Sequence, residues 1–154
     1  MALYLVQHGK NNPKDVDPEQ HLSDEGREEV RRIAQAAKQH ALKVRRIDHS
    51  PKDRAKETAE IFASLLQPEQ GVSERQGIKA LDDVHDLARS LDAKDEDVML
   101  VGHLPFMEKL TAYLAAGKDE PPVLTFQNGG IVCLKRNEEG GNWVVAWTLM
   151  PRIE

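Results

Sequence analysis

Short apolar runs alternate along the chain with longer segments in which apolar residues recur at helical spacing. The runs are typical of strands that are buried on both faces, and the spaced pattern is typical of amphipathic helices. The expected strands cover residues 2–6, 44–48, a weak run within 68–79, 98–101, 130–134 and 143–149. The expected helices have their buried positions within residues 30–41, 55–66, 84–91 and 107–114.

Strands that alternate with helices favour an α/β fold, because parallel strands need a long crossover that is usually a helix. Four helices are enough to cover both faces of such a sheet. The last two strands are close enough to form a hairpin through a turn at Gly140 and Gly141, so at least one strand should run antiparallel. We therefore expect a single domain over residues 1–154, a three-layer α/β/α sandwich with a mostly parallel central sheet.

Local signals predict the placement of two further features. Ser50, Pro51 and Asp53 have the order of an N-cap, a first and a third helical position, so the second helix is expected to begin directly after Ser50. Trp143 and Trp147 are four residues apart in an expected strand, and this spacing predicts that both rings lie on one face of the sheet.

Composition narrows the class of protein. The 154 residues are 40% hydrophobic and 31% charged, which is typical of a globular domain with its own core. The net charge of −5 argues against a broad nucleic-acid surface, and no apolar run approaches the roughly 18 residues of a membrane span. Cys133 is the single cysteine and is not followed by the arginine of a cysteine-phosphatase loop. We expect a cytoplasmic protein that has no nucleic-acid partner and no membrane association.

Polar side chains suited to phosphate chemistry follow three of the expected strands. The residues at these strand ends are Gln7, His8 and Gly9, then Ser50 and Arg54, then Gly102 and His103. In an open α/β sheet, ligands bind outside the carboxyl ends of the strands, where helix N-termini also gather. An arginine fork matches phosphate oxygens, and a neutral imidazole can attack phosphorus. The sequence therefore predicts an oxyanion pocket at this edge of the sheet.

The strand ends belong to three longer motifs, which read LVQHG at 5–9, SPKDRAKETA at 50–59 and VGHLP at 101–105. In this order they resemble the signatures of the histidine phosphatase superfamily, and LSDEG at 22–26 resembles its entry to the first helix. The short chain is most similar to SixA-type phosphohistidine phosphatases. The resemblance covers residues 2 to about 115 and implies a phosphoglycerate mutase-like fold.

The resemblance also implies roles for particular residues. His8 matches the nucleophile that accepts the phosphoryl group, Arg54 matches the arginine that binds the phosphate, and His103 matches the histidine that stabilises the transferring group. Gln7 and Gly9 would line the substrate pocket beside them. Such a scheme needs no metal and no cofactor, because protein cations provide the electrostatic stabilisation.

The sequence departs from the family pattern at Gln7, where the first motif usually has arginine. Glutamine keeps two N–H donors but lacks the charge and the rigid fork. A hydrogen bond to a charged group contributes about 1.5–3 kcal/mol, so its loss would lower phosphate or transition-state binding about ten- to a hundredfold. Lys10 is close enough in sequence to restore a positive charge.

The candidate general acids are Asp82 and Asp83, which precede the third expected helix. Relatives place an acidic residue in this region, and a leaving group can need such a proton donor. The alternative interpretation is that the two aspartates form the N-cap and first turn of that helix.

Three functions are compatible with these motifs. The first is a phosphatase with a phosphohistidine intermediate that acts on phosphohistidine in a protein; a chain too short for large helical insertions would leave a pocket open to a protein loop. The second is a weakened pseudo-phosphatase that binds phosphate or a phosphorylated partner, because Gln7 replaces the arginine. The third is a phosphomonoesterase for small phosphate esters. The oligomeric state stays open, with a monomer preferred.

Overall fold

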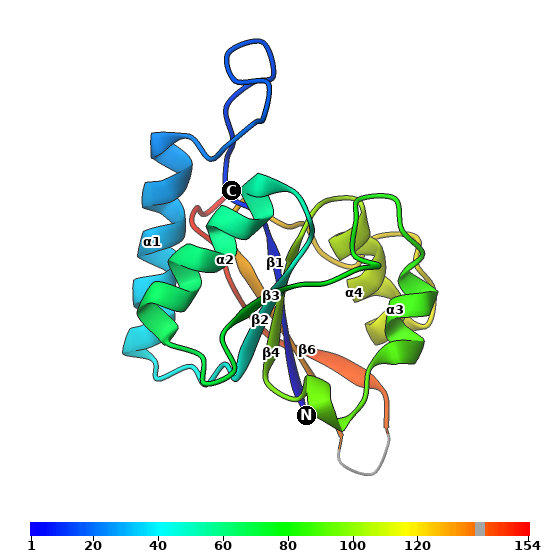
Figure 1. Cartoon of the computed structure of the whole chain (residues 1–154). Coiled ribbons are helices and arrows are strands. Elements are labelled where there is room, and N and C mark those ends of the chain that lie inside the picture. The colour runs from blue at the N-terminus through cyan, green and yellow to red at the C-terminus, as the bar shows by residue number, and fades with distance from the viewer. Residues whose placement is uncertain (138–140) are drawn as a thin grey trace.

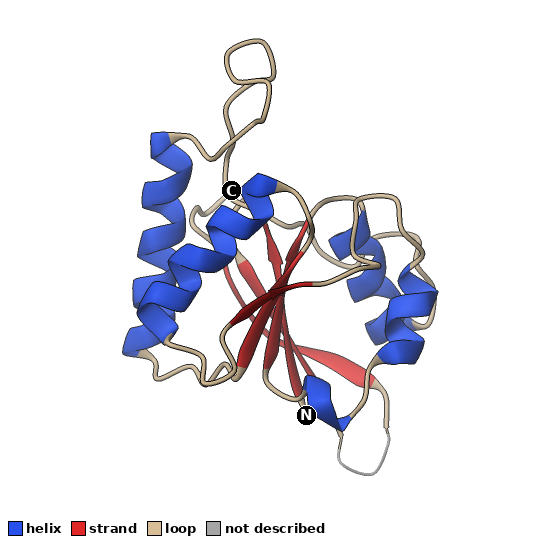
Figure 2. Cartoon of the chain, viewed as in Figure 1, coloured by secondary structure: helices blue, strands red, loops and turns tan. Residues whose placement is uncertain are grey.

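The protein has one mixed β-sheet covered by helices on both faces (Figure 1, Figure 2). The computed structural model describes residues 1–137 and 141–154. The strands are β1 (Ala2–Gln7), β2 (Arg46–His49), β3 (Val72–Glu74), β4 (Val98–Gly102), β5 (Ile131–Arg136) and β6 (Trp143–Leu149). The helices are α1 (Asp24–Gln39), α2 (Asp53–Leu66), α3 (Val84–Ser90) and α4 (Phe106–Ala116), with a short 3-10 helix, η1 (Ala93–Asp95), before β4.

The sheet has the strand order β3-β2-β4-β1-β5-β6. The strands β2, β4 and β1 are parallel neighbours, whereas β5 pairs antiparallel with both β1 and β6. The expectation of a mostly parallel sheet with an antiparallel strand is therefore confirmed. The carboxyl ends of β1, β2 and β4 lie at one edge, which is where the predicted oxyanion pocket requires them.

Alternation along the central strands divides the core into two layers. On β1, Tyr4 and Val6 pack toward α1 and α2, whereas Leu3 and Leu5 pack toward α3 and α4. Figure 1 shows the two helix pairs on opposite sides of the sheet. The three-layer α/β/α architecture expected from the sequence is thus confirmed. No helix in the described part of the chain is long and apolar enough to cross a membrane.

The start of the second helix differs from the prediction. Its N-cap is Lys52, in an extended conformation with no side-chain capping bond, and α2 begins at Asp53. Ser50 stays outside the helix because its hydroxyl bonds to His103 instead. The first helix, by contrast, has Ser23 as its N-cap, with the hydroxyl accepting from the amide of Gly26 at 3.0 Å.

The two tryptophans lie on opposite faces of the sheet, so the prediction of a shared face was wrong. The register between β5 and β6 shifts between Cys133 and Leu134, and this bulge reverses the alternation along β6. Trp143 is buried in the α3/α4 layer, whereas Trp147 packs in the α1/α2 layer, with its ring 6.0 Å from that of Tyr4. In the predicted hairpin turn, Gly140 lies outside the described residues.

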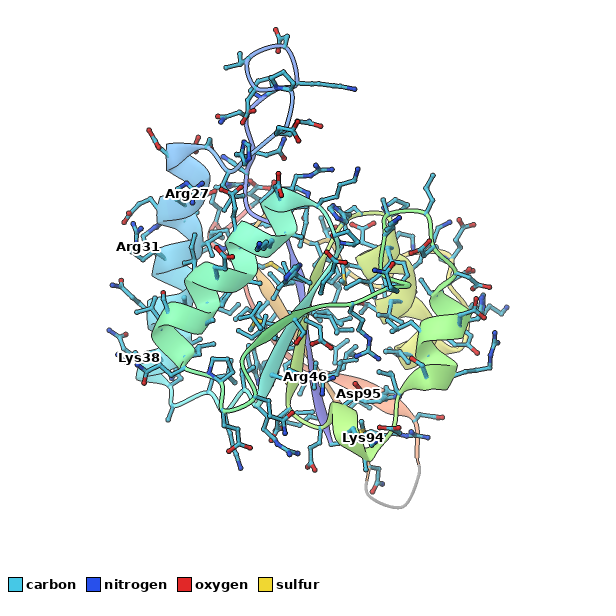
Figure 3. The ribbon with its side chains drawn as sticks, in the orientation of Figure 1. Arg27, Arg31, Lys38, Arg46, Lys94 and Asp95 are labelled. Atoms are coloured by element: carbon cyan, nitrogen blue, oxygen red, sulfur yellow. The ribbon has the colours of Figure 1, made fainter. Side chains whose placement is uncertain are left out.

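A charged cluster joins β2 to the segments around β3 and η1 (Figure 3). The guanidinium of Arg46 donates to Asp48 at 2.9 Å and to Asp95 at 3.0 Å. Arg75 donates to the same two carboxylates, at 3.1 and 2.8 Å. Asp48 and Asp95 are buried, so their charges depend on these partners. The cluster therefore fixes the edge of the sheet on the β3 side.

Candidate active site

Backbone hydrogen bonds lock together the segments that follow β1, β2 and β4. The amide of His8 donates to the carbonyl of Gly102 at 2.9 Å, and the amide of Ser50 donates to the carbonyl of Val101 at 3.0 Å. The rings of His8 and His103 consequently face each other, with centroids 5.0 Å apart and planes inclined at 55°. The structure thus brings the two predicted histidines to one site.

The ring of His8 is held in one tautomer by its own turn. Its Nδ1 lies 2.8 Å from the carbonyl oxygen of Gly9, and because that oxygen can only accept, Nδ1 carries the hydrogen. Nε2 therefore has a free lone pair. Burial lowers the pKa of His8, and the nearby charge of Arg54 lowers it further. The lowered pKa favours the neutral ring of His8 at neutral pH, with a lone pair on Nε2.

The turn at Gly9 depends on a close approach to α1. A Cβ at this position would lie 2.7 Å from a methyl carbon of Val30 and 3.2 Å from one of Leu22. The amide of Gly9 donates to the hydroxyl of Thr58 at 2.9 Å, and that hydroxyl donates to the carbonyl of Arg54 at 2.7 Å. The absence of a side chain at Gly9 therefore lets the turn that orients His8 sit against α1 and α2.

His103 is buried, and its ring contacts the hydroxyl of Ser50. Its Nε2 lies 2.5 Å from the hydroxyl of Ser50. Burial, followed by the charges of His8, Arg54 and Lys52, lowers the pKa of His103 to about 4. Because burial is the largest cause, the low pKa mainly reflects how enclosed the ring of His103 is, and the positive charges of Arg54 and Lys52 add to that effect.

Arg54 lies in the first turn of α2 and is partly exposed. Its positive charge lowers the pKa of both His8 and His103, so the three groups share one electrostatic environment. Arg54 also opens onto a polar cavity of about 330 Å³. The residues that line this cavity are Lys14, Pro18, Glu19, Gln20, Pro51, Lys52, Asp53 and Arg54. The predicted arginine is therefore accessible to an anion that approaches from solvent.

Gln7 pairs with Gly102 across β1 and β4, and its carbonyl accepts from the amide of Gly129 at 2.8 Å. Its side-chain Oε1 is buried and has no hydrogen-bond partner among the described residues. A buried acceptor without a donor is costly. Lys10 does not compensate for the missing charge, because its ammonium pairs with Glu25 at 2.9 Å. Gln7, the uncharged residue in the first motif, thus also has a buried side-chain oxygen without a hydrogen-bond donor among the described residues.

The two aspartates considered as general acids have local structural partners. Asp83 is the N-cap of α3 and accepts from the amide of His85 at 2.8 Å, while Asp82 accepts from the amide of Lys79 at 2.8 Å. The amide of His85 and then its ring lower the pKa of Asp83. Asp83 therefore has the geometry of a helix cap. Its lowered pKa also keeps the carboxyl ionised at neutral pH. This agrees with the alternative interpretation for Asp83, whereas Asp82 lies one residue before the N-cap and outside the first turn.

Three of the residues that shape the site are given no specific role in it by the sequence patterns. Ser50 has the pattern of a helix cap, although its place beside a strand end is a usable signal. Thr58 lies one helical turn after Arg54 inside the second motif, which is also a usable signal. Asn128 donates from Nδ2 to the carbonyl of His8 at 2.9 Å, and no sequence pattern points to it because it lies in the loop before β5.

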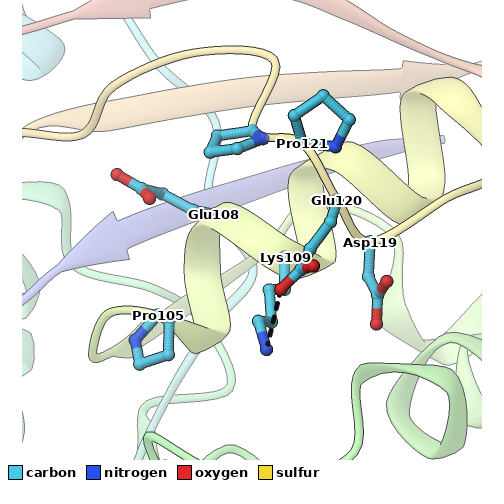
Figure 4. Close-up of a pocket in the computed structure, with 7 residues that line it drawn as sticks. Pro105, Glu108, Lys109, Asp119, Glu120 and Pro121 are labelled. Atoms are coloured by element: carbon cyan, nitrogen blue, oxygen red, sulfur yellow. Dashed lines mark ion pairs between the residues drawn. The ribbon is translucent and has the colours of Figure 1, made fainter.

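A second cavity begins two residues after His103, at the start of α4 (Figure 4). It has a volume of about 560 Å³, and an ion pair between Lys109 and Glu120, 3.6 Å apart, lies in its wall. The lining residues are Pro105, Glu108, Lys109, Asp119, Glu120, Pro121 and Pro122. The structure therefore has open space on the α4 side of the sheet as well as beside Arg54.

The sequence matches the family described as the histidine phosphatase superfamily (branch 1) over residues 3–79, so the chain belongs to that superfamily. Among solved structures, the fold is similar to the protein histidine phosphatase SixA complexed with tungstate. That structure has 24% sequence identity and a TM-score of 0.84, with 98% of this chain and 97% of the other covered. The expected family and the expected similarity to SixA-type structures are therefore confirmed.

Two further solved structures share the fold at lower identity. A mycobacterial glucosyl-3-phosphoglycerate phosphatase in complex with VO3 is 16% identical, with a TM-score of 0.72 and coverage of 97% of this chain and 99% of the other. A phosphoserine phosphatase from Entamoeba histolytica, in complex with 3-phosphoglyceric acid, is also 16% identical, with a TM-score of 0.69 and 96% of each chain covered. A sequence search of curated proteins gives no match.

Proposed function

We propose that this protein is a phosphatase in which Nε2 of His8 attacks phosphorus and becomes phosphorylated. The observation that carries the proposal is the hydrogen bond from Nδ1 of His8 to the carbonyl of Gly9, which leaves a lone pair on Nε2. The ring of His103, 5.0 Å from that of His8, and the positive charge of Arg54, which lowers the pKa of His8, support a site for an anion beside His8.

The reaction has two displacements at phosphorus. In the first, a bond forms between Nε2 of His8 and phosphorus, and the bond from phosphorus to the leaving group breaks, with its electron pair going to the leaving nitrogen or oxygen. A proton from solvent or a nearby acid neutralises that group. In the second, water attacks phosphorus, the nitrogen–phosphorus bond breaks, and inorganic phosphate and neutral His8 are released after the water loses a proton.

The substrate that fits best is phosphohistidine in a protein. A phosphoramidate nitrogen needs less help from a strong acid than an alkoxide does, and Asp83 is an ionised helix cap. The similarity of the fold to SixA supports the same choice. The two cavities beside Arg54 and α4 leave room for a protein loop. The single-domain organisation, the cytoplasmic location and the preference for a monomer stay predictions.

A second candidate function is binding of phosphate or a phosphorylated partner with little turnover. It is favoured by Gln7, whose side chain brings a buried, unpartnered oxygen in place of a charged fork. The other pocket groups would still bind an anion. This candidate and the phosphatase differ in turnover, whereas both predict binding at the same residues.

The test is a substrate panel that contains a phosphohistidine peptide, an aryl phosphate and a small phosphate ester. We expect the wild-type protein to hydrolyse the phosphohistidine peptide most efficiently, and we expect His8→Ala to lose all turnover. The matched control is His40→Ala, because His40 is exposed at the end of α1. Phosphate binding by calorimetry with no turnover of any substrate would support the binding function. Unchanged turnover by His8→Ala would overturn both the phosphatase mechanism at His8 and the binding function.

A further inference from the structure

The hydroxyl of Ser50 is one of the most tightly enclosed polar groups in the protein. The residue has 0% exposure, and its hydroxyl lies 2.5 Å from Nε2 of His103. Its backbone is fixed on both sides, because the amide donates to Val101 at 3.0 Å and the carbonyl accepts from Nδ1 of His49 at 2.7 Å. These backbone hydrogen bonds therefore hold Ser50 at the position where its hydroxyl meets His103.

The direction of the bond between Ser50 and His103 follows from counting hydrogens. Among the described residues, the hydroxyl of Ser50 has one hydrogen-bond partner, which is Nε2 of His103. If Nε2 carried the ring hydrogen, the hydroxyl hydrogen would be buried without an acceptor, which is costly. The hydroxyl therefore donates, Nε2 accepts, and the ring hydrogen of neutral His103 is on Nδ1.

The other nitrogen of His103 is open to the site. In the part of the chain that the structure describes, the buried side-chain polar atoms without a partner are Oε1 of Gln7 and Oε1 of Glu29. Nδ1 of His103 is not one of them, and it has no hydrogen-bond partner within the same described residues, so it is accessible. It belongs to the ring that faces His8 at 5.0 Å.

We propose that Ser50 is a positioning residue that holds His103 in the Nδ1–H tautomer, so that a neutral imidazole presents a hydrogen-bond donor to the phosphoryl group. The kinetic consequence of this inference rests on the proposed phosphatase function. The tautomer of His103 does not depend on that function. Donation from a neutral ring matters here because burial, and then the charges of Arg54 and Lys52, oppose a positive charge on His103. The two histidines then carry complementary roles: His8 offers a lone pair at Nε2, and His103 offers a hydrogen at Nδ1.

The experiment uses ¹⁵N-histidine-labelled protein and long-range ¹H–¹⁵N spectra at neutral pH, which distinguish a protonated from an unprotonated ring nitrogen. His103→Asn identifies the signals of His103. In the wild type we expect a hydrogen on Nδ1 and a lone pair on Nε2 of His103. In Ser50→Ala we expect His103 to shift to the Nε2–H form or to a mixture, while His8 keeps its hydrogen on Nδ1.

Kinetics provide the second readout. Ser50→Ala should lower kcat for the phosphohistidine peptide about tenfold, with a smaller change in KM, because one aligned donor is lost in the transition state. Ser50→Thr keeps the hydroxyl and should retain the wild-type tautomer and most of the rate. The matched control is Ser64→Ala, which removes an exposed hydroxyl that donates to Ile61 on α2.

The outcomes separate this inference from the proposed function. A hydrogen on Nε2 of His103 in the wild-type protein, or an unchanged tautomer in Ser50→Ala, would overturn the role of Ser50 even if the protein is an active phosphatase. The expected tautomers in a protein without turnover would support Ser50 and contradict the phosphatase instead. If Ser50→Ala does not fold, the wild-type and Ser50→Thr spectra still decide the question.

Discussion

The rings of His8 and His103 face each other at 5.0 Å although they follow different strands, β1 and β4. Their closeness is a direct result of strand order, because β1 and β4 are parallel neighbours whose carboxyl ends coincide at Gln7 and Gly102. One imidazole has its Nδ1 bonded to its own turn, and the other has its Nε2 bonded to Ser50. The nitrogens without a protein partner therefore differ between the two rings, Nε2 in His8 and Nδ1 in His103, as the proposed roles of nucleophile and donor require.

Replacing Gln7 by arginine should raise turnover of the phosphohistidine peptide about ten- to a hundredfold, because a charged fork returns to the oxyanion pocket. The measurement is kcat/KM for both proteins under identical conditions. Gln35→Arg adds the same charge on the exposed face of α1 and should leave the rate unchanged. No gain in Gln7→Arg would mean that the uncharged side chain does not limit catalysis.

Activity should persist to a pH below the ordinary range of histidine. Burial lowers the pKa of both rings, that of His103 to about 4, so His8 keeps its lone pair to a lower pH than an ordinary histidine does. In a pH profile of kcat/KM, we expect the acid limb to lie below the usual histidine value of about 6.5. An acid limb whose midpoint lies at or above pH 6.5 would contradict the lowered pKa values of His8 and His103.

The same shifts make the folded protein less stable in acid. The unfolded chain binds protons on these histidines near pH 6.5, whereas the folded chain does not until the pH falls further. The free energy of unfolding should therefore fall as the pH is lowered from about 6.5 toward 4. His103→Asn removes one contributor and should flatten that dependence in urea titrations. An equal slope in both proteins would count against a neutral, buried His103.

Gly9→Ala should destabilise the protein by about 1–3 kcal/mol, because the new methyl group would lie 2.7 Å from a methyl carbon of Val30. It should also reduce turnover, since the carbonyl that orients His8 belongs to the same residue. Adding Val30→Ala makes room, so the double variant should regain turnover relative to Gly9→Ala. A double-mutant cycle on kcat and on unfolding free energy checks both effects, and additivity of the two substitutions would refute the steric cause.

Asp95→Asn should cost about 1–3 kcal/mol of stability, because it leaves Arg46 and Arg75 with one carboxylate between them. Burial alone would raise the pKa of Asp95, yet its bonds from Arg75 and from the amide of Asp92 hold the pKa below the usual value. The stability that ionised Asp95 contributes is present at neutral pH and is lost as the pH falls through the lowered pKa of Asp95. Urea unfolding at two pH values tests this, with Asp15→Asn in an exposed loop as the control.

The sequence is sufficient to predict the layers and the edge of the sheet where the site lies. Apolar runs such as 98–101 are fully buried in the structure, and the histidines stand directly after them. The side-chain period of a strand and the gathering of parallel strand ends at one edge are general properties of α/β sheets. The amino-acid sequence alone therefore predicts that His8, Arg54 and His103 lie together.

Features that depend on single hydrogen bonds or on one inserted residue cannot be predicted in the same way. The bulge opposite Leu134 separates Trp143 from Trp147, although their spacing in sequence is regular. Ser50 has an ideal place for a helix cap, and only the packing of β2 against β4 gives its hydroxyl a closer partner in His103. Asn128 reaches His8 from a loop without any local pattern.

The measurement that tests the central claim most directly is the location of phosphate during turnover. Wild-type protein is mixed with phosphohistidine peptide, quenched within milliseconds in alkali to preserve a nitrogen–phosphorus bond, and analysed by peptide mass spectrometry. The account predicts a phosphate on the peptide that contains His8, absent in His8→Ala and gone once substrate is consumed. Hydrolysis that proceeds with no phosphate on His8, and at the same rate in His8→Ala, would contradict it.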